Sequence, residues 1–242
     1  MKRSGIEYFL NRRTGKALHD YKMISDGDRI LVGVSGQDSL SLLNILNERS
    51  RYVPVRYKLI PVHIDINRKN AKTIENYLKK SGLKYHIIKI NLNENKKKDI
   101  HKTECFWCSW KRREAIFKMA NRVKCNKIVL AHHLDDILET LFMNIFFQGE
   151  TSTMPPKLRM FKGRFHIIRP FCYLEKRQIE KYAILKKIPI MPYECPYGKL
   201  TNRAAMRSII EGLRKKYPRV KENIFKSMAN IRKGYLPIKG IG

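Results

Sequence analysis

Apolar and polar residues follow two different periods along this chain, and the two periods alternate. Short apolar runs, which are typical of buried strands, lie at residues 29–34, 58–65, 85–90, 127–131 and 165–169. Between them apolar residues recur every three or four positions, which predicts helices over residues 40–46, 71–80, 105–123, 135–147 and 174–186. Strands that alternate with helices favour right-handed crossovers. The predicted fold is therefore α/β, a parallel twisted sheet with helices on both faces.

Polar, basic segments flank this α/β region and predict helical extensions at both ends. Residues 1–27 are interpreted as a basic helical extension, residues 28–190 as the α/β domain, and residues 191–242 as a basic, mostly helical segment. Residues 91–102 are polar and rich in lysine, without periodicity, and predict a loop. The last segment contains a basic run that is expected on the surface, in contact with phosphates: Arg214, Lys215, Lys216, Arg219 and Lys221.

The charge balance indicates a polyanionic partner. The 242 residues include 51 Lys and Arg against 21 Asp and Glu, a formal net charge of +30. Such an excess favours nucleic acid, because each neutralised phosphate releases counterions. Apolar residues make up 43% of the chain, enough for a core. No apolar run approaches the ~20 residues of a membrane-spanning helix, and no signal-peptide pattern follows the basic start. A cytoplasmic protein without a membrane partner is expected.

A short polar loop follows the first predicted strand and opens a helix. Backbone N–H groups and the helix dipole favour anions at this place in an α/β sheet. Gly36 permits close backbone approach, and Asp38 is suited either to bind Mg²⁺ or to cap the helix. The loop is the candidate phosphate-binding element, in the order Ser35, Gly36, Gln37, Asp38, Ser39.

A C-x-x-C pair, Cys105 and Cys108, lies near the start of a predicted helix, where the dipole lowers a thiol pKa. With Cys195 as a third ligand, the set suits an iron–sulfur cluster with one open iron. His101 or His132 could instead complete a zinc site, and a redox dithiol is the third interpretation. The two remaining cysteines lie in apolar surroundings and are expected in the core: Cys125 and Cys172.

Four polar residues come directly after the strand at 127–131: His132, His133, Asp135 and Asp136. Ligands of α/β sheets bind at the carboxyl ends of the strands. Either aspartate could hold magnesium or act as an acid or base. The simpler alternative is that Asp135 caps the following helix and that both histidines only pack.

These motifs together resemble the tRNA 2-thiocytidine synthetases, iron–sulfur-dependent tRNA thiolases of the PP-loop ATP pyrophosphatase superfamily. The resemblance runs from about Lys16 to Lys239 and is carried by residues 20–36, C-F-W-C-S-W-K-R-R and A-H-H-L-D-D-I-L-E-T-L, with M-P-P-K-L, I-I-R-P and P-I-M-P further on. Three features depart from the family pattern. The loop S-G-Q-D-S is one residue shorter than S-G-G-x-D-S, Leu134 replaces an arginine, and a single cysteine stands at 195.

The resemblance implies an ATP-dependent tRNA sulfurtransferase of PP-loop fold. ATP and Mg²⁺ would bind at the loop with Asp65 and His132, and a [4Fe–4S] cluster at Cys105, Cys108 and Cys195. It implies that the C2 oxygen of a tRNA pyrimidine, with cytidine-32 of the anticodon loop preferred, is adenylated and then replaced by sulfur delivered through the cluster. The implied catalytic residues are Asp38, Arg112, Asp135 and Asp136. The implied partners are tRNA, a sulfide or persulfide donor and a second copy of the chain.

Three other interpretations stay open at this point. The cysteine at 195 stands in a C-P-Y context that is similar to uridine-thiolating relatives, which would make the product 2-thiouridine. The shortened loop would also fit a non-catalytic RNA-binding protein on a decayed PP-loop scaffold. Lysidine-type or other amide-forming chemistry is disfavoured, because the three cysteines would then have no use.

Overall fold

A computed structural model describes residues 5–66, 70–90, 104–191 and 202–237, with the side chains of residues 104 and 105 left out. By its internal contacts the chain divides into two compact units. The first unit contains residues 1–133 and 155–197, and the second contains residues 134–154 and 198–242. The division of the chain at residues 27 and 190 stays a prediction.

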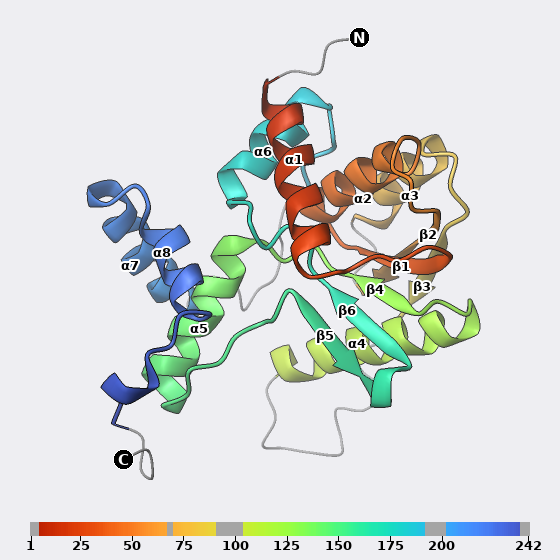
Figure 1. The fold of residues 1–242 in the computed structure, drawn as a ribbon. Helices are drawn as coiled ribbons and strands as arrows, with labels where there is room; N and C mark the ends of the chain where they lie inside the picture. Colours follow the sequence, from red (N-terminus) through yellow and green to blue (C-terminus); the bar gives the residue numbers. More distant parts are fainter. Residues whose placement is uncertain (1–4, 67–69, 91–103, 192–201, 238–242) are drawn as a thin grey trace. The chain divides into compact units, whose positions relative to one another are not determined.

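One sheet forms the centre of the first unit (Figure 1). Within the described residues it has six strands in the order β3-β2-β1-β4-β6-β5. Their bounds are β1 Asp28–Val34, β2 Tyr57–Asp65, β3 His86–Lys89, β4 Lys127–Val129, β5 Lys157–Met160 and β6 Phe165–Ile168. Neighbouring strands are parallel except β5, which pairs antiparallel with β6. The predicted α/β fold with a mainly parallel sheet is confirmed.

The edge strand β5 is the element that the sequence pattern did not predict. Its sequence, K-L-R-M, alternates polar and apolar residues over four positions and is only half-buried. It follows two prolines, Pro155 and Pro156, and bonds to one neighbour only. A strand that is half-buried at a sheet edge lacks the continuous apolar run by which the interior parallel strands are recognised.

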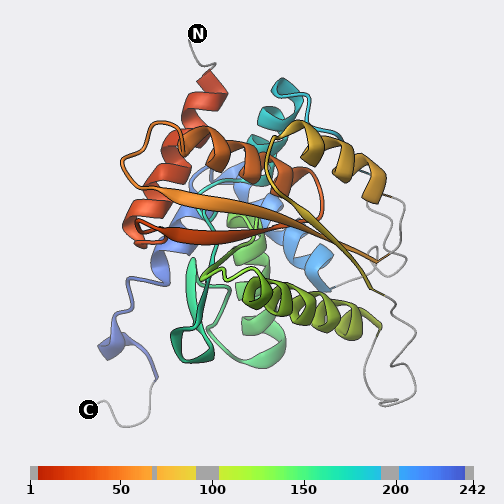
Figure 2. The same ribbon diagram turned by 90° about the vertical axis from the view of Figure 1, so that its right-hand side faces the viewer.

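Helices cover both faces of this sheet. Figure 2 shows α2 and α3 on one side and α4 on the other. The helices of the first unit are α1 Gly5–Asp20, α2 Gln37–Arg49, α3 Ala71–Lys80, α4 Glu104–Arg122 and α6 Lys176–Leu185. The helix predicted over 71–80 is confirmed at both ends, and Gly82 follows it with a φ of 70°, a left-handed conformation that glycine adopts without strain.

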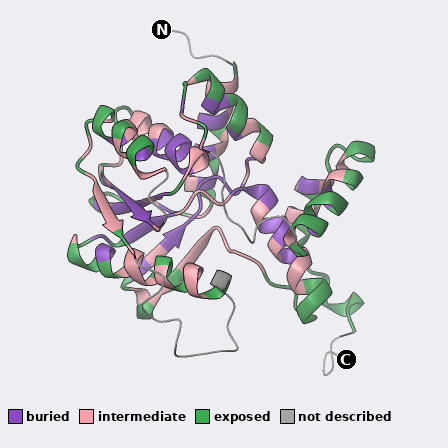
Figure 3. Cartoon of the chain, turned by 180° about the vertical axis from the view of Figure 1, so that it is seen from behind, coloured by how far each residue is buried: buried purple, intermediate pink, exposed green. Residues whose placement is uncertain are grey.

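The core of the first unit lies between the sheet and its helices. Ile30, Leu31 and Val32 of β1 are fully buried, because this central strand has a neighbour on each side and helices over both faces. On the α4 face, Leu31 packs in one cluster with Val62 and Met119. Figure 3 shows the buried residues along the strands and on the inward sides of the helices.

The second unit is helical. Its elements are α5 Leu134–Gln148, α7 Asn202–Lys216, α8 Val220–Ser227 and the short 3-10 helix η3 Lys233–Tyr235. Leu134 and Leu138 of α5 pack against Ile210 of α7, with Ile224 and Phe225 of α8 at the margin. In the described parts of both units, no helix combines the length and the apolar character that crossing a bilayer requires.

Candidate active site

The sheet changes its winding direction between β1 and β4, which are adjacent and parallel. The chain after β1 leads to β2 on one side, whereas β4 is followed in the sheet by β6 on the other. In open α/β sheets, ligands bind at the carboxyl ends of the strands at this switch point. Ser35 and Gly36 follow β1, and His132 and His133 follow β4. The predicted loop and the predicted histidines therefore lie at the same edge of the sheet.

The Ser39 side chain closes the loop after β1. Its Oγ accepts hydrogen bonds from the backbone N–H groups of Ser35 at 2.9 Å and Gly36 at 3.1 Å, and it donates to the Gly36 carbonyl at 2.8 Å. Because α2 begins at Gln37, Gly36 is the N-cap residue. An added Cβ at Gly36 would meet nothing within 4 Å. Folding alone does not require glycine here, and the open space is compatible with a ligand that approaches the backbone.

Asp38 lies in the first turn of α2, so the alternative that it caps this helix is wrong. Its two carboxylate oxygens accept hydrogen bonds from Lys176 Nζ at 2.6 and 2.7 Å. His133 Nε2 lies 3.9 Å from Asp38 Oδ2. The Asp38 carboxylate is thus paired with the Lys176 ammonium, and His133 lies beside that carboxylate.

Sequence reasoning did not find Lys176. It is the first residue of α6, 138 positions from Asp38. The one available signal was the place of the lysine at a helix start, where a cation opposes the helix dipole. A nearby carboxylate offsets that unfavourable interaction.

His63 of β2 is a second residue that was not predicted. It is buried, and its Nδ1 lies 2.8 Å from the Val34 carbonyl, just before the loop. A carbonyl oxygen can only accept, so Nδ1 carries the proton of the ring. Burial lowers the pKa of His63, opposed by the Val34 hydrogen bond and the charge of Asp65, while the charge of Arg112 lowers it further. His63 is therefore neutral at neutral pH, and the predicted residues Asp65 and Arg112 both act on it electrostatically.

His132 is oriented by Arg169, which directly follows β6. Arg169 Nε donates to His132 Nδ1 at 3.2 Å, and its guanidinium also donates to the Pro155 carbonyl. Burial lowers the pKa of Arg169 to about 10, so the group stays cationic at neutral pH. Since Nδ1 of His132 accepts, the ring proton lies on Nε2. Arg169 stands in the I-I-R-P motif, but its contact with His132 joins residues 37 positions apart, and no local spacing predicted it.

The two predicted aspartates belong to the second unit. Asp135 is buried and accepts a hydrogen bond from Lys221, which also donates to Glu211. Asp136 is half-buried, with Oδ1 at 4.0 Å from Arg203 Nη2. Because α5 begins at Leu134, Asp135 is inside the helix and the alternative that it is the N-cap is wrong.

The prediction that Lys221 lies on the surface is also wrong, since only 3% of the residue is exposed. A buried ammonium needs charged partners, and Asp135 and Glu211 provide them. The other members of the predicted basic run are less enclosed. Arg214 is half-buried and pairs with Glu211 at 3.0 Å, while Lys216 and Arg219 are exposed.

The cysteines separate into two groups. Cys125 and Cys172 are buried, as predicted, and burial raises the pKa of Cys125 to about 11 and that of Cys172 to about 12. Cys108 is half-buried, without a disulfide, in the first turns of α4. Cys105 is three positions earlier on that helix, and residues at this spacing share a helix face.

Two thiols at this spacing are a donor pair suited to an iron–sulfur cluster. The predicted third ligand, Cys195, lies outside the described residues, as does the side chain of Cys105. Within the described ranges, no three His, Cys, Asp or Glu side chains are grouped to hold a metal ion.

Comparison with known proteins gives concordant results. Residues 8–212 match the family model of the PP-loop domain. The tRNA-cytidine(32) 2-sulfurtransferase of Polynucleobacter asymbioticus is 37% identical over 237 residues, 96% of this chain and 78% of that protein. The protein of the same name from Alcanivorax borkumensis is 37% identical, covering 92% of this chain and 80% of its own length.

A solved structure resembles the chain in fold. It is the U34-tRNA thiolase NcsA from Methanococcus maripaludis, solved with its [4Fe-4S] cluster. The TM-score is 0.77 at 21% sequence identity, and the match covers 93% of this chain and 78% of that one.

Proposed function

The chain belongs to the PP-loop family and, within it, to the tRNA-cytidine(32) 2-sulfurtransferases, and we propose on this basis that it thiolates C2 of cytidine 32 in tRNA at the cost of ATP. The observation that carries the proposal is the loop at the switch point. Asp38, Lys176 and His133 converge there, at the N-terminus of α2. That arrangement supports nucleotide use despite the shortened motif.

The proposed reaction has two steps. The C2 oxygen of the pyrimidine attacks the α-phosphorus of ATP, an O–P bond forms, and the bond to the β-phosphate breaks to release pyrophosphate. A sulfur nucleophile then attacks C2, the C–O bond breaks, and AMP leaves with the oxygen. With sulfide as the nucleophile, its proton is lost to solvent and no electron is transferred, whereas sulfur from a persulfide donor must first be released as sulfide by a thiol reductant.

The residues of the loop edge contribute to the first step. The N-terminus of α2 and the loop backbone bind phosphate oxygens. Asp38 is the carboxylate that would hold Mg²⁺, and Lys176, which contacts both of its oxygens, would have to give up at least one of them to the metal. Arg112 is the proposed cation for the charge that develops on the phosphate.

Further residues are proposed to act on the substrates. His132 and Asp65 are proposed to contact the nucleoside. Of the two aspartates of α5, Asp136 is preferred as the group that acts at the base, because Lys221 occupies Asp135.

Cys105, Cys108 and Cys195 are the residues proposed to hold a [4Fe–4S] cluster. When bound, such a cluster supplies an iron with an open position for a sulfur ligand. The half-buried position of Cys108, in the first turns of α4, supports access to it from outside. Mg²⁺, a sulfide or persulfide donor, a homodimer and a cytoplasmic location all stay predictions.

Pyrophosphate release tests the proposal directly. Anaerobically purified protein is mixed with ATP, Mg²⁺ and tRNA transcripts that carry either cytidine or uridine at position 32. Release that requires cytidine, and that is lost in Asp38→Ala, supports the proposal. Equal release with uridine would favour the 2-thiouridine interpretation, and absence of ATP binding by calorimetry would favour the decayed scaffold.

A further inference from the structure

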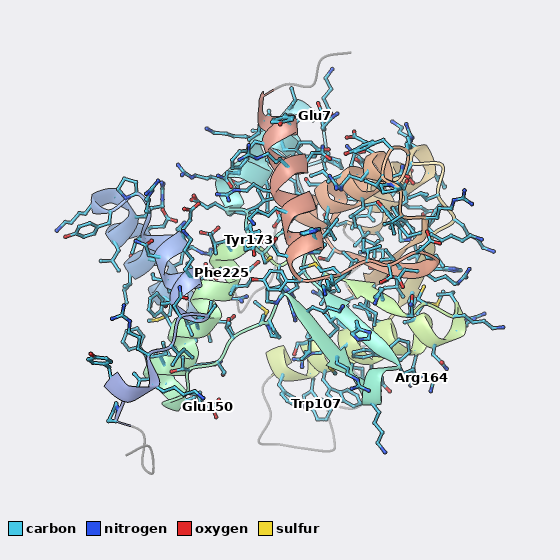
Figure 4. The ribbon with its side chains drawn as sticks, viewed as in Figure 1. Glu7, Trp107, Glu150, Arg164, Tyr173 and Phe225 are labelled. Carbon is cyan, nitrogen blue, oxygen red and sulfur yellow. The ribbon has the colours of Figure 1, made fainter. Side chains whose placement is uncertain are left out.

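Three aromatic side chains follow one another in the first turns of α4. Phe106 and Trp107 pack edge to face with ring centroids 5.7 Å apart, and Trp107 and Trp110 do so at 5.9 Å. Phe106 is 42% exposed and Trp110 is 43% exposed. Figure 4 labels Trp107, whose side chain extends from the amino-terminal part of the helix. We call Phe106, Trp107 and Trp110 the aromatic cluster.

This aromatic cluster is separate from the hydrophobic core. The core face of α4 begins further along the helix, with residues such as Ala115, Ile116 and Met119 packed against the sheet. Rings of this size gain most of their stabilising energy from burial. Two such rings at more than 40% exposure therefore contribute little to the folded state, so packing alone does not explain them.

The chemistry around the aromatic cluster is that of a nucleic-acid surface. Lys111 follows Trp107 by four positions and Arg113 follows Trp110 by three, so both cations lie on the helix face that carries these rings. Proteins that hold unpaired nucleotides combine stacking rings with basic residues that contact the backbone. Cys108 lies between Trp107 and Trp110 in the chain, on the same two helical turns. A base held by the aromatic cluster would therefore lie next to Cys108, a predicted ligand of the iron–sulfur cluster.

We propose that Phe106, Trp107 and Trp110 form a stacking platform for an unpaired base of the tRNA loop, with Lys111 and Arg113 on the adjoining phosphates. The proposal rests on the proposed function for its substrate, a tRNA. A base must leave its stack before its C2 can be reached, and a ring that replaces the lost stacking partner lowers that cost. The platform thus holds the loop open beside Cys108.

The sequence offers a direct probe of the platform. The chain has two tryptophans, and both belong to the aromatic cluster. Tryptophan emission from the full, anaerobically purified protein therefore reports on these positions alone. The ligands are an anticodon stem-loop RNA and the same RNA with abasic nucleotides in its loop. Both keep the phosphates, and only the first keeps the bases.

The platform predicts that the intact stem-loop quenches the emission strongly, whereas the abasic one binds, as followed by fluorescence anisotropy, with little quenching. Equal quenching by both RNAs would overturn the proposal. So would an unchanged emission when the intact loop is bound.

Variants separate stacking from folding. Trp110→Leu and Phe106→Leu keep an apolar side chain and remove a ring. Each should weaken binding of the intact stem-loop about tenfold, since one base stack is lost. Binding of the abasic RNA should change little. Trp110→Phe should restore most of the affinity. The matched control is Tyr8→Leu on α1, where the tyrosine is 59% exposed, and it should leave both affinities unchanged.

A loss of affinity that is equal for the intact and abasic RNAs would indicate a merely structural role of the rings and would overturn the proposal. The test is independent of the reaction. If the unmutated protein releases pyrophosphate with tRNA but binds both stem-loops identically, the platform fails and the proposed function stands. If base-dependent quenching is present without any thiolation, the platform stands and the proposed function fails.

Discussion

The buried lysine of the second unit gives the sharpest stability prediction. Lys221 on α8 donates to Asp135 on α5 and to Glu211 on α7, so one ammonium joins these three helices. Lys221→Met keeps most of the side-chain volume and removes the charge. Asp135 is then left buried without this ammonium.

The magnitude follows from the exposure of the two carboxylates. Removal of one partner of a buried ion pair costs about 3–5 kcal/mol, because the remaining charge stays desolvated. Glu211 is half-exposed and keeps Arg214 at 3.0 Å, so its share is about 1 kcal/mol or less. Asp135 accounts for most of the rest. We expect Lys221→Met to lower the free energy of unfolding of the second unit by about 3 kcal/mol.

Urea unfolding followed by far-ultraviolet circular dichroism measures this loss. Lys226→Met is the matched control, since Lys226 is exposed on the same helix and should change stability by about 0.5 kcal/mol or less. The double variant Lys221→Met/Asp135→Asn removes the remaining charge and should recover a large part of the loss. A loss below about 1 kcal/mol for Lys221→Met would contradict this expectation, because it would mean that Asp135 is not desolvated.

The pH dependence of this stabilisation has a definite sign. Its partners raise the pKa of Lys221 above the ordinary 10.5 despite burial, so the lysine contributes fully below that value and the contribution is lost as the pH rises further. Burial opposes but does not cancel the effect of Lys221 and Arg214, which lower the pKa of Glu211 below 4.5. The contribution of Glu211 is present above pH 4.5 and is lost as the pH falls below it. The difference between the native protein and Lys221→Met should therefore be largest between these limits.

The remaining predictions concern the first unit. Lys176→Gln frees both oxygens of Asp38, so the Mg²⁺ concentration for half-maximal pyrophosphate release should fall about fivefold, the equivalent of one partly exposed ion pair; a higher Mg²⁺ requirement would contradict this. Ser39→Ala removes the acceptor of two loop N–H groups and should weaken ATP binding in calorimetry, whereas an unchanged affinity would mean that the loop is held otherwise. Cys108→Ala should abolish anaerobic iron binding and Cys125→Ala should keep it, as measured by iron content per chain, and iron retained in the first variant would remove Cys108 from the ligand set.

The sequence predicted those parts of the fold in which local pattern and tertiary environment agree. The apolar run of β1 is buried on both faces, and α3 ends where Ser81 and Gly82 follow it. Prediction from the sequence failed for β5, because a short edge strand with alternating polar residues has no distinctive pattern. The loop after β1 could be predicted because its motif directly follows an apolar run in the sequence, so that no distant contact is needed to place it.

The site was only partly predictable, since its remaining contacts join distant residues. Lys176 reaches Asp38 over 138 positions, and Arg169 reaches His132 over 37. The basic run predicts Lys221 on the surface, whereas its pairing with Asp135, 86 positions away, and with Glu211 accounts for its burial. Such pairings depend on how elements pack, which no local spacing encodes.

Mass spectrometry of tRNA nucleosides can detect whether this chain places sulfur on a tRNA cytidine. tRNA is taken from cells without the gene, with the gene restored, and with Asp38→Ala in its place. We predict 2-thiocytidine only with the unmutated gene, at position 32 of the anticodon loop. 2-Thiocytidine that persists without the gene, or a gene-dependent 2-thiouridine in its place, would contradict it.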